Sequence, residues 1–231
     1  MFNFIRKSTL FDAWDKELHK QISHDGKYHL KTAQDLAVFT FLHDLRGKRI
    51  AEVGGGNSRI LSATSKLNEC YNIEKFEGAD GGPSEEIHVK NVKNILAYLG
   101  EGSKDIPRNF FDVVFSVSVV EHVPLDGLDS FFREGLESLK PGGLWLHAID
   151  IYIEDNPSAG WEERFEAYRN WALHPLVRPL GEIYSGPLKF SCDMATNPDS
   201  TMYQWGKISP GLIDLRKRAQ SASILVAVTK R

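Results

Sequence analysis

The segment I-A-E-V-G-G-G-N-S, residues 50–58, constrains the fold of this chain more than any other feature. A short apolar run ends in three consecutive glycines, and an apolar pattern resumes at Ile60-Leu61. A strand, a glycine turn and a helix start are the units with which an α/β protein brings its backbone close to a bound ligand. The segment therefore predicts a doubly wound, mostly parallel sheet whose ligand lies at the carboxyl ends of the strands.

Two side chains around this turn indicate which ligand it accepts. Glu52 precedes the first glycine by two residues, where a carboxylate would repel a pyrophosphate. Arg59 occupies the position of the third glycine of a dinucleotide-binding turn. A cofactor with a positively charged amino acid end fits better, and S-adenosylmethionine is the candidate. Glu74, at the end of the next expected strand, is placed to accept hydrogen bonds from both ribose hydroxyls.

Composition narrows the classes of function. The chain has 231 residues with 28 Lys and Arg against 31 Asp and Glu, and its net charge of −3 gives no reason to expect nucleic acid as a partner. No apolar run approaches the roughly 18 residues that cross a bilayer. The first residues are unlike a signal peptide, because their charge follows a very short apolar piece. We expect a cytoplasmic protein.

Hydrophobic periodicity predicts seven strands with helices on both faces of the sheet. The expected strands are 50–53, 70–73, 87–89, 111–118, 144–149, 188–193 and 223–229, and the expected helices are 8–45, 59–66, 94–99 and 128–139. We expect one domain over 1–231, with a helical cap at 1–47, a cofactor-binding core at 48–150, an acceptor-side insertion at 151–187 and closing strands at 188–231. In the insertion, Trp161, Phe165 and Tyr168 share one helical face, which is either core or the wall of an acceptor pocket.

Several motifs between Lys48 and Asp150 together resemble the class I S-adenosylmethionine-dependent methyltransferases. E-V-G-G-G-N (52–57) resembles the first family motif, F-D-V-V-F-S (111–116) with E-H-V (121–123) resembles the fourth-strand motif, and L-K-P-G-G (139–143) resembles the turn before the fifth strand. The resemblance departs at 91–92, where Asn-Val stands in place of an adenine-binding aspartate. The residues that the turn and the resemblance predict to bind the cofactor are Glu52, Gly54, Gly55, Gly56, Asn57, Ser58, Glu74, Asn91, Val92, Ser116 and Ser118.

Three residues are candidates for a general base that activates a hydroxyl acceptor. His122 follows the fourth expected strand, and His147 and Asp150 lie near the end of the fifth. Two alternatives stay open, since His122 could shape the cofactor pocket and His147 could be a core histidine. His147 and Asp150 alone do not make a metal site, and we predict none.

The resemblance implies methyl transfer from S-adenosylmethionine with S-adenosylhomocysteine as product. We expect O-methylation of a small molecule or a sugar or glycan intermediate, and a homodimer is a candidate assembly. A catalytically inactive scaffold with the same fold is the alternative. A nicotinamide-dependent oxidoreductase is a third option, which Arg59 and Glu52 oppose.

Overall fold

A computed structural model describes residues 1–24, 30–79, 82–153, 158–186 and 220–231. Its strands are β1 (Phe2–Phe4), β2 (Arg49–Val53), β3 (Glu69–Ile73), β4 (Val92–Ile95), β5 (Phe111–Val117), β6 (Leu139–Ile153), β7 (Val177–Pro179) and β8 (Gln220–Lys230). Its helices are α1 (Lys7–Asp15), α2 (Leu18–Gln21), α3 (Leu30–Leu42), α4 (Arg59–Thr64), α5 (Leu128–Ser138) and α6 (Ala159–Leu173), with 3-10 turns η2 (Val120–His122) and η3 (Leu125–Gly127).

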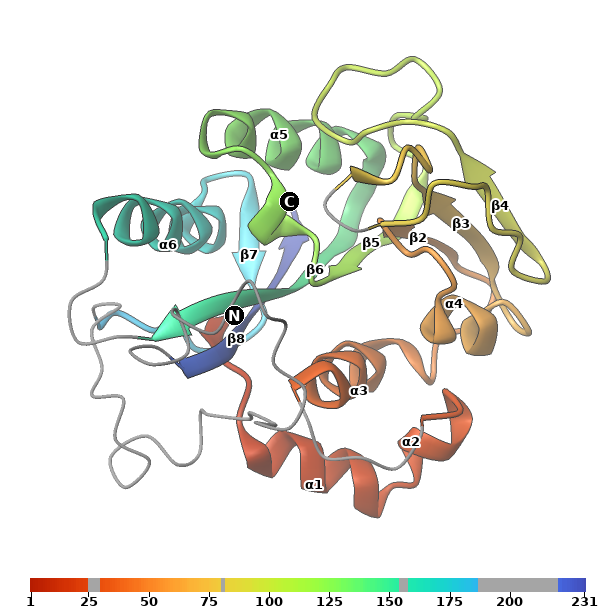
Figure 1. Cartoon of the computed structure of the whole chain (residues 1–231), viewed down its shortest axis with the longest axis horizontal. Coiled ribbons are helices and arrows are strands. Elements are labelled where there is room, and N and C mark those ends of the chain that lie inside the picture. The colour runs from red at the N-terminus through yellow and green to blue at the C-terminus, as the bar shows by residue number, and fades with distance from the viewer. Residues whose placement is uncertain (25–29, 80–81, 154–157, 187–219) are drawn as a thin grey trace.

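The strands form one sheet in the order β1-β8-β6-β5-β2-β3-β4, with β7 also paired to β8 (Figure 1). The pairs among β2, β3, β4, β5 and β6 are parallel, and all pairs with β8 are antiparallel. From β2 the chain adds β3 and β4 on one side and then β5 and β6 on the other. The order of the strands therefore reverses between the parallel neighbours β2 and β5, and a ligand site is expected at the carboxyl ends of these two strands. The predicted doubly wound, mostly parallel α/β fold is confirmed.

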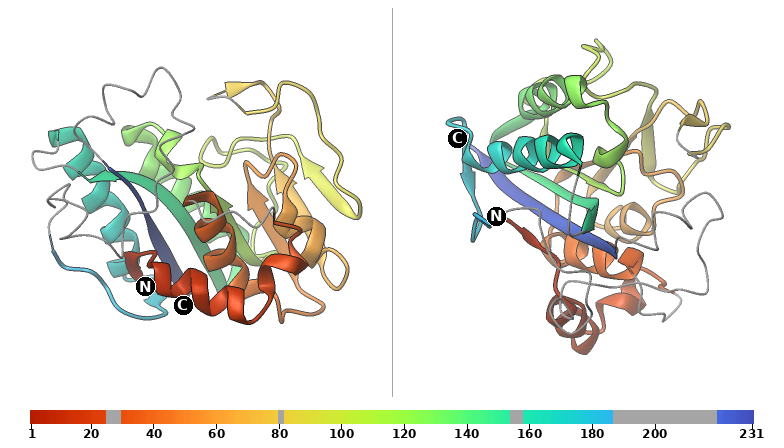
Figure 2. Two further views of the ribbon diagram at one scale, coloured as in Figure 1. Left: turned by 60° about the horizontal axis from the view of Figure 1, so that its bottom comes forward. Right: turned by 60° about the vertical axis from the view of Figure 1, so that its left-hand side comes forward.

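Helices cover both faces of the sheet, and alternate residues of each central strand point to opposite cores (Figure 2). Val113 and Phe115 of β5 pack with the face covered by α1, α3 and α4, whereas Val114 packs with the face covered by α5 and α6. Burial on both faces explains why β5 reads as a nearly continuous apolar run.

The stretch 8–45, expected to be helical, contains three helices in the described residues. The sequence prediction was wrong for the third parallel strand. The third parallel strand is β4 at 92–95, so the strand expected at 87–89 and the helix expected at 94–99 are both wrong. The segment V-K-N-I is short, polar and half-buried at the sheet edge, and therefore lacks the apolar signal of a central strand.

The outer edge of β8 is shared by two short strands. β1 pairs with Ile224–Val226, and β7 pairs with Val228–Lys230. β1 was not predicted, because three residues are too few for a periodic signal. The predicted strand at 223–229 is confirmed within β8, and the one at 188–193 lies outside the described residues.

Candidate active site

The glycine turn after β2 depends on close backbone approach. Gly54 has φ +65°, and a Cβ there would lie 2.7 Å from Cγ2 of Val119. The Gly55 N–H donates to Oδ1 of Asn72 over 3.0 Å. Asn72 is buried within β3, and the sequence reasoning missed it. A polar residue inside an otherwise apolar strand was the signal that could have identified it.

Glu52 lies beneath this turn and is almost completely buried. Burial raises the pKa of its carboxyl to about 8, although a hydrogen bond from the Ser58 hydroxyl opposes this rise. Its Oε2 has no hydrogen-bond partner among the described residues. The Ser58 hydroxyl also accepts from the Leu61 N–H over 2.9 Å, so it caps α4. Glu52 is therefore a buried acid with one oxygen free for a ligand.

A pocket of about 290 Å³ opens at the carboxyl ends of β2, β3, β4 and β5. Of the predicted residues, Gly54, Glu74, Ser118 and His122 line it. Glu74 is half-buried, and loss of solvent raises the pKa of its carboxyl. The remaining wall is mainly apolar and comes from the glycine-rich loop, the segment after β4 and helix α5: Val53, Ile73, Ala79, Gly82, Pro83, Ala97, Tyr98, Leu99, Val119, Val123 and Phe131.

Not every predicted cofactor residue reaches this pocket. Asn91 and Val92 lie at the amino end of β4, the opposite end from the pocket, because the strand begins five residues later than expected. The segment that takes their expected place is Ala97–Leu99, which follows β4. Gly55, Gly56 and Asn57 belong to the turn but are not part of the pocket wall.

The structure contradicts the roles predicted for Ser116 and His147. Ser116 is fully buried, and its hydroxyl lies 2.7 Å from Nδ1 of His147. The His147 ring is also fully buried, 3.9 Å from the Trp145 ring and in edge contact with Phe131 and Trp171. Burial lowers the pKa of His147 to about 3, so it is a neutral core histidine without access to an acceptor.

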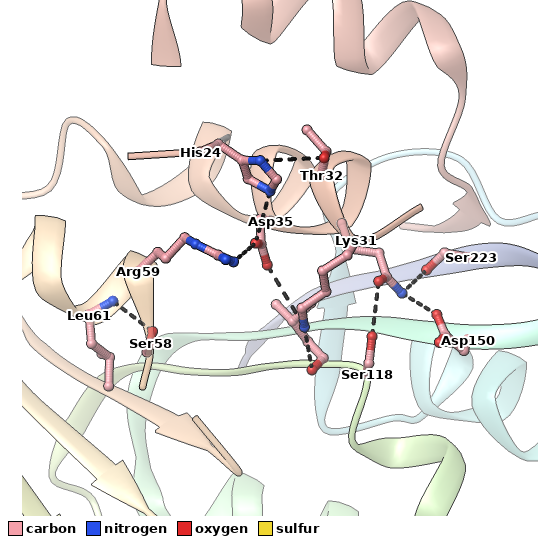
Figure 3. Close-up of polar contacts among 12 residues, drawn as sticks. His24, Lys31, Thr32, Asp35, Ser58, Arg59, Leu61, Ser118, Asp150 and Ser223 are labelled. Atoms are coloured by element: carbon pink, nitrogen blue, oxygen red, sulfur yellow. Dashed lines mark hydrogen bonds and ion pairs between the residues drawn. The ribbon is translucent and has the colours of Figure 1, made fainter. Parts of the chain in front are cut away.

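Asp150 lies near the end of β6 and is held by α3. Gln34 donates through Nε2 to Oδ1 of Asp150 and to the Ser223 hydroxyl, and its Oε1 accepts from the Ser118 hydroxyl over 2.9 Å. Figure 3 labels Ser118, Asp150 and Ser223, the three partners of these hydrogen bonds. Gln34 thereby connects Asp150 to Ser118, a residue of the pocket wall.

Glu121 in η2 is a second acid at this end of the sheet that the sequence reasoning did not select. Both of its carboxyl oxygens are buried without a hydrogen-bond partner among the described residues. Burial, and then the charge of Asp150, raise the pKa of Glu121 to about 8. It precedes His122, which lines the pocket.

Asp35 of α3 joins the helical cap to the glycine turn. Its Oδ2 lies 3.5 Å from Nη1 of Arg59 and 3.5 Å from Nε2 of His24, and its Oδ1 lies 3.9 Å from Nζ of Lys31 (Figure 3). The Lys31 ammonium also donates to the Val117 carbonyl over 3.3 Å. Arg59, which replaces the third glycine of the dinucleotide motif, thus contacts the cap.

The aromatic side chains of helix α6 pack in the hydrophobic core and do not line an open acceptor pocket. Phe165 and Tyr168 of α6 are buried, and Trp161 is partly buried against Tyr152. Arg164 donates to the Val123 carbonyl over 2.7 Å and so connects α6 to the pocket rim.

Comparisons with known proteins agree with this geometry. Residues 51–146 match the family model described as a methyltransferase domain. Protein-L-isoaspartate O-methyltransferase of Pyrococcus abyssi is 27% identical over 146 residues, which are 62% of this chain and 61% of that protein. The chain thus spans about three fifths of the length of this curated relative.

Two solved structures share the fold. Geranyl diphosphate C-methyltransferase of Streptomyces coelicolor A3(2), in complex with Mg2+, geranyl diphosphate and S-adenosyl-L-homocysteine, has a TM-score of 0.56 and 14% identity over 87% of this chain and 80% of that chain. Phosphoethanolamine N-methyltransferase 2 of Haemonchus contortus, in complex with S-adenosyl-L-methionine, has a TM-score of 0.55 and 15% identity over 94% of this chain and 57% of that chain.

The sheet and the pocket at its switch point define a Rossmann-like methyltransferase fold. The domain match covers residues 51–146, and this part of the chain is similar to the S-adenosylmethionine-dependent methyltransferases.

Two features are absent from the part of the chain that the structure describes. No helix there is both long and apolar enough to span a membrane. No group of three or more His, Cys, Asp or Glu side chains lies there in an arrangement that could hold a metal ion.

Proposed function

We propose that this protein transfers a methyl group from S-adenosylmethionine to a hydroxyl of a small molecule or a sugar or glycan intermediate. The observation that carries the proposal is the pocket between the glycine turn and Glu74, with His122 in its wall and Asp150 connected through Gln34 to Ser118 of that wall. A hydroxyl needs a base when it attacks a methyl group, and Asp150, Glu121 and His122 are the titratable groups at this end.

The residues present fit the cofactor. Glu74 lies in the pocket wall and can accept two hydroxyl hydrogen bonds, which suits a ribose. The unpartnered Oε2 of Glu52 suits the ammonium of an amino acid end. The apolar Ala97–Leu99 segment suits the face of a base. When bound, the cofactor supplies an electrophilic methyl group on sulfur.

Protein residues then need only to align the acceptor, exclude water and accept a proton. Alignment of a nucleophile against the methyl carbon supplies much of the rate, because binding removes the entropy cost of their encounter. His122 lies in the pocket wall, and we infer that it shapes the pocket or contacts the acceptor. His147 takes no part in this proposal.

The experiment that tests the acceptor class uses methyl-labelled S-adenosylmethionine and a panel of hydroxyl compounds, sugars, amines and an isoaspartyl peptide. We expect label in a hydroxyl compound or sugar, at an oxygen identified by mass spectrometry of the product. Label only on nitrogen, carbon or the peptide carboxyl would refute O-methylation of these acceptors while leaving methyl transfer intact.

The alternative is a catalytically inactive scaffold with the same fold. It predicts that S-adenosylmethionine is either not bound or bound without transfer to any acceptor. An oxidoreductase would instead be stabilised by NAD, and an unchanged melting temperature with saturating NAD would exclude it. A cytoplasmic location and a homodimer remain predictions from the sequence.

A further inference from the structure

Ser118, in the pocket wall, has a backbone conformation that serine seldom adopts. It is the first residue after β5, and its φ of +55° lies in the left-handed region. This conformation is unfavourable for every residue with a Cβ, and such residues occur at functional sites where their surroundings hold them in place. The contacts of Ser118 must therefore supply that support.

The left-handed turn at Ser118 places the next residue against the glycine turn. The Val119 side chain occupies the space beside Gly54, where a Cβ on Gly54 would lie 2.7 Å from Cγ2 of Val119. All three residues line the pocket. The conformation of Ser118 thus determines how the segment after β5 meets the glycine turn, and with it the shape of the pocket between them.

Two side chains of α3 hold the end of β5 (Figure 3). The Ser118 hydroxyl donates to Oε1 of Gln34 over 2.9 Å, and the Lys31 ammonium donates to the Val117 carbonyl over 3.3 Å. The Ser118 N–H also donates to the Ala148 carbonyl of β6 over 2.9 Å. Of these three bonds, the one to Gln34 is the bond that depends on the side chain at position 118.

Gln34 is itself fixed from the other side. It is 1% exposed, and its Nε2 donates to the Asp150 carboxyl and to the Ser223 hydroxyl, the latter over 3.0 Å. With both ends of the amide bonded, its oxygen turns away from Ser118 only if the bonds to β6 and β8 break. Gln34 belongs to α3, whereas the family match begins at residue 51, so this support comes from the helical cap.

We propose that Gln34 is a positioning residue of the cofactor site, which holds Ser118 in the left-handed conformation that the binding pocket requires. The inference rests on the proposed assignment of this pocket to S-adenosylmethionine. Without the hydrogen bond, residue 118 relaxes toward ordinary backbone angles in the empty site. The cofactor then binds only the fraction of molecules in which the turn is formed, and the apparent Kd rises as that fraction falls.

A double-mutant cycle between positions 34 and 118 tests the proposal by calorimetric titration with S-adenosylmethionine. Gln34→Met keeps the length of the side chain but removes its hydrogen bonds. It should raise the Kd about tenfold when Ser118 is present, because a left-handed residue without its support is unfavourable by an amount of this order. In a Ser118→Gly background it should raise the Kd less than about twofold, because glycine adopts a positive φ without support.

Ser118→Ala and Ser118→Gly separate the backbone conformation from the hydroxyl group. Both variants lose the hydroxyl, but only alanine keeps the penalty of a positive φ. We therefore expect Ser118→Ala to bind the cofactor about tenfold more weakly than Ser118→Gly. These variants keep Gln34, so the comparison holds even where Gln34→Met does not fold. Equal affinities in the two would assign the effect to the hydroxyl itself and would overturn the positioning role.

Ser223→Ala is the matched control, because it removes another hydrogen bond of the same amide at a residue outside the pocket wall. It should lower the melting temperature, since Ser223 is fully buried and also donates to the Ile149 carbonyl over 2.9 Å. Because it leaves the bond between Gln34 and Ser118 in place, the Kd should stay within about twofold of the wild-type value.

Two further results would overturn the proposal. One is wild-type affinity in a folded Gln34→Met, as judged by circular dichroism. The other is an equal loss of affinity from Gln34→Met in the Ser118 and Ser118→Gly backgrounds, which would show that Gln34 acts through the general stability of the fold. A wild type that does not bind S-adenosylmethionine would instead refute the cofactor site itself, and this proposal with it.

Discussion

At the scale of single residues, the site combines backbone positions that only glycine suits with acids that burial keeps protonated. Gly54 needs both a positive φ and an empty space beside Val119. The buried Oε2 of Glu52 has no hydrogen-bond partner among the described residues, so the carboxyl is stable only when it is protonated or contacts a ligand. Both requirements identify the turn as a binding element rather than a simple connection.

We predict that Gly54→Ala destabilises the turn by about 1–3 kcal/mol and weakens cofactor binding, because a Cβ meets Val119 at a left-handed backbone position. Gly102→Ala is the control, since Gly102 has φ +72° with open space around it. Calorimetric titration with S-adenosylhomocysteine measures the effect. Equal affinities in the two variants would show that Val119 yields to the methyl group.

The raised pKa of Glu52 predicts how stability depends on pH. Its folded pKa of about 8 exceeds the ordinary value of 4.5, so its contribution to stability is complete below about pH 4.5 and is lost as the pH rises through 8. Glu52→Gln cannot ionise and should gain stability relative to wild type by up to about 4 kcal/mol between about pH 5 and pH 8. Urea unfolding at both pH values measures this difference. A difference that does not change with pH would contradict a buried, protonated Glu52.

At the scale of elements, helix α5 fits the sheet through one small residue. A Cβ on Gly135 would lie 2.0 Å from Cζ3 of Trp145 in β6, so the helix approaches the strand where it has no side chain. The Trp145 ring makes edge contacts there with Phe131, Phe132 and Trp171. Because Phe131 also lines the pocket, the position of α5 on the sheet determines one wall of the site.

Gly135→Ala should therefore cost about 1–3 kcal/mol of unfolding free energy, despite the higher helix propensity of alanine. Gly160→Ala in α6 provides the comparison, because no atom lies within 4 Å of a Cβ at that position. Thermal unfolding of both variants measures the effect. If Gly135→Ala were as stable as Gly160→Ala, the close contact with Trp145 would be incorrect.

Helices and strands with a clear hydrophobic periodicity were predictable from sequence. Elements that depend on contacts with residues far away in the sequence were not. β2, β5 and α5 were predicted because buried β-branched runs and three-to-four spacing are local signals. β4 was missed because an edge strand carries polar residues. The role of Gln34 depends on partners 84 to 189 positions away, and no sequence spacing indicates such contacts.

The site was predicted only in part for the same reason. Gly54, Glu74 and Ser118 lie at strand ends, and their places follow from the order of the strands. His147 follows the same rule by position, but it lies within β6, where side chains alternate between the two faces, and its ring points into the core. The missing information was the face of the sheet to which the side chain of a given strand residue points.

At the scale of the whole molecule, the two ends of the described chain meet in the sheet. Phe2 pairs with Val226 of β8, its N–H donates to the Glu182 carbonyl, and its carbonyl accepts from the Tyr184 N–H. Its ring is fully buried, 5.1 Å from that of Phe165 in α6. The N-terminal segment therefore closes the sheet and supports the insertion helix.

Phe2→Ala should cost about 3–5 kcal/mol, because it leaves a cavity between β8 and α6. Phe11→Ala is the control, since that ring is 52% exposed on α1. Urea unfolding reports both values. A loss below about 1 kcal/mol for Phe2→Ala would mean that β1 does not pack as described.

The central claim is that the pocket between Gly54 and Glu74 binds S-adenosylmethionine, and calorimetric titration of the protein with this compound tests it most directly. We predict saturable binding by wild type, and a loss of about 1–3 kcal/mol in Glu74→Ala, the scale of a charge-assisted hydrogen bond. Glu85→Ala is the matched control, because Glu85 is exposed and lies outside the pocket wall. Binding that is absent at millimolar cofactor, or unchanged in Glu74→Ala, would contradict the site.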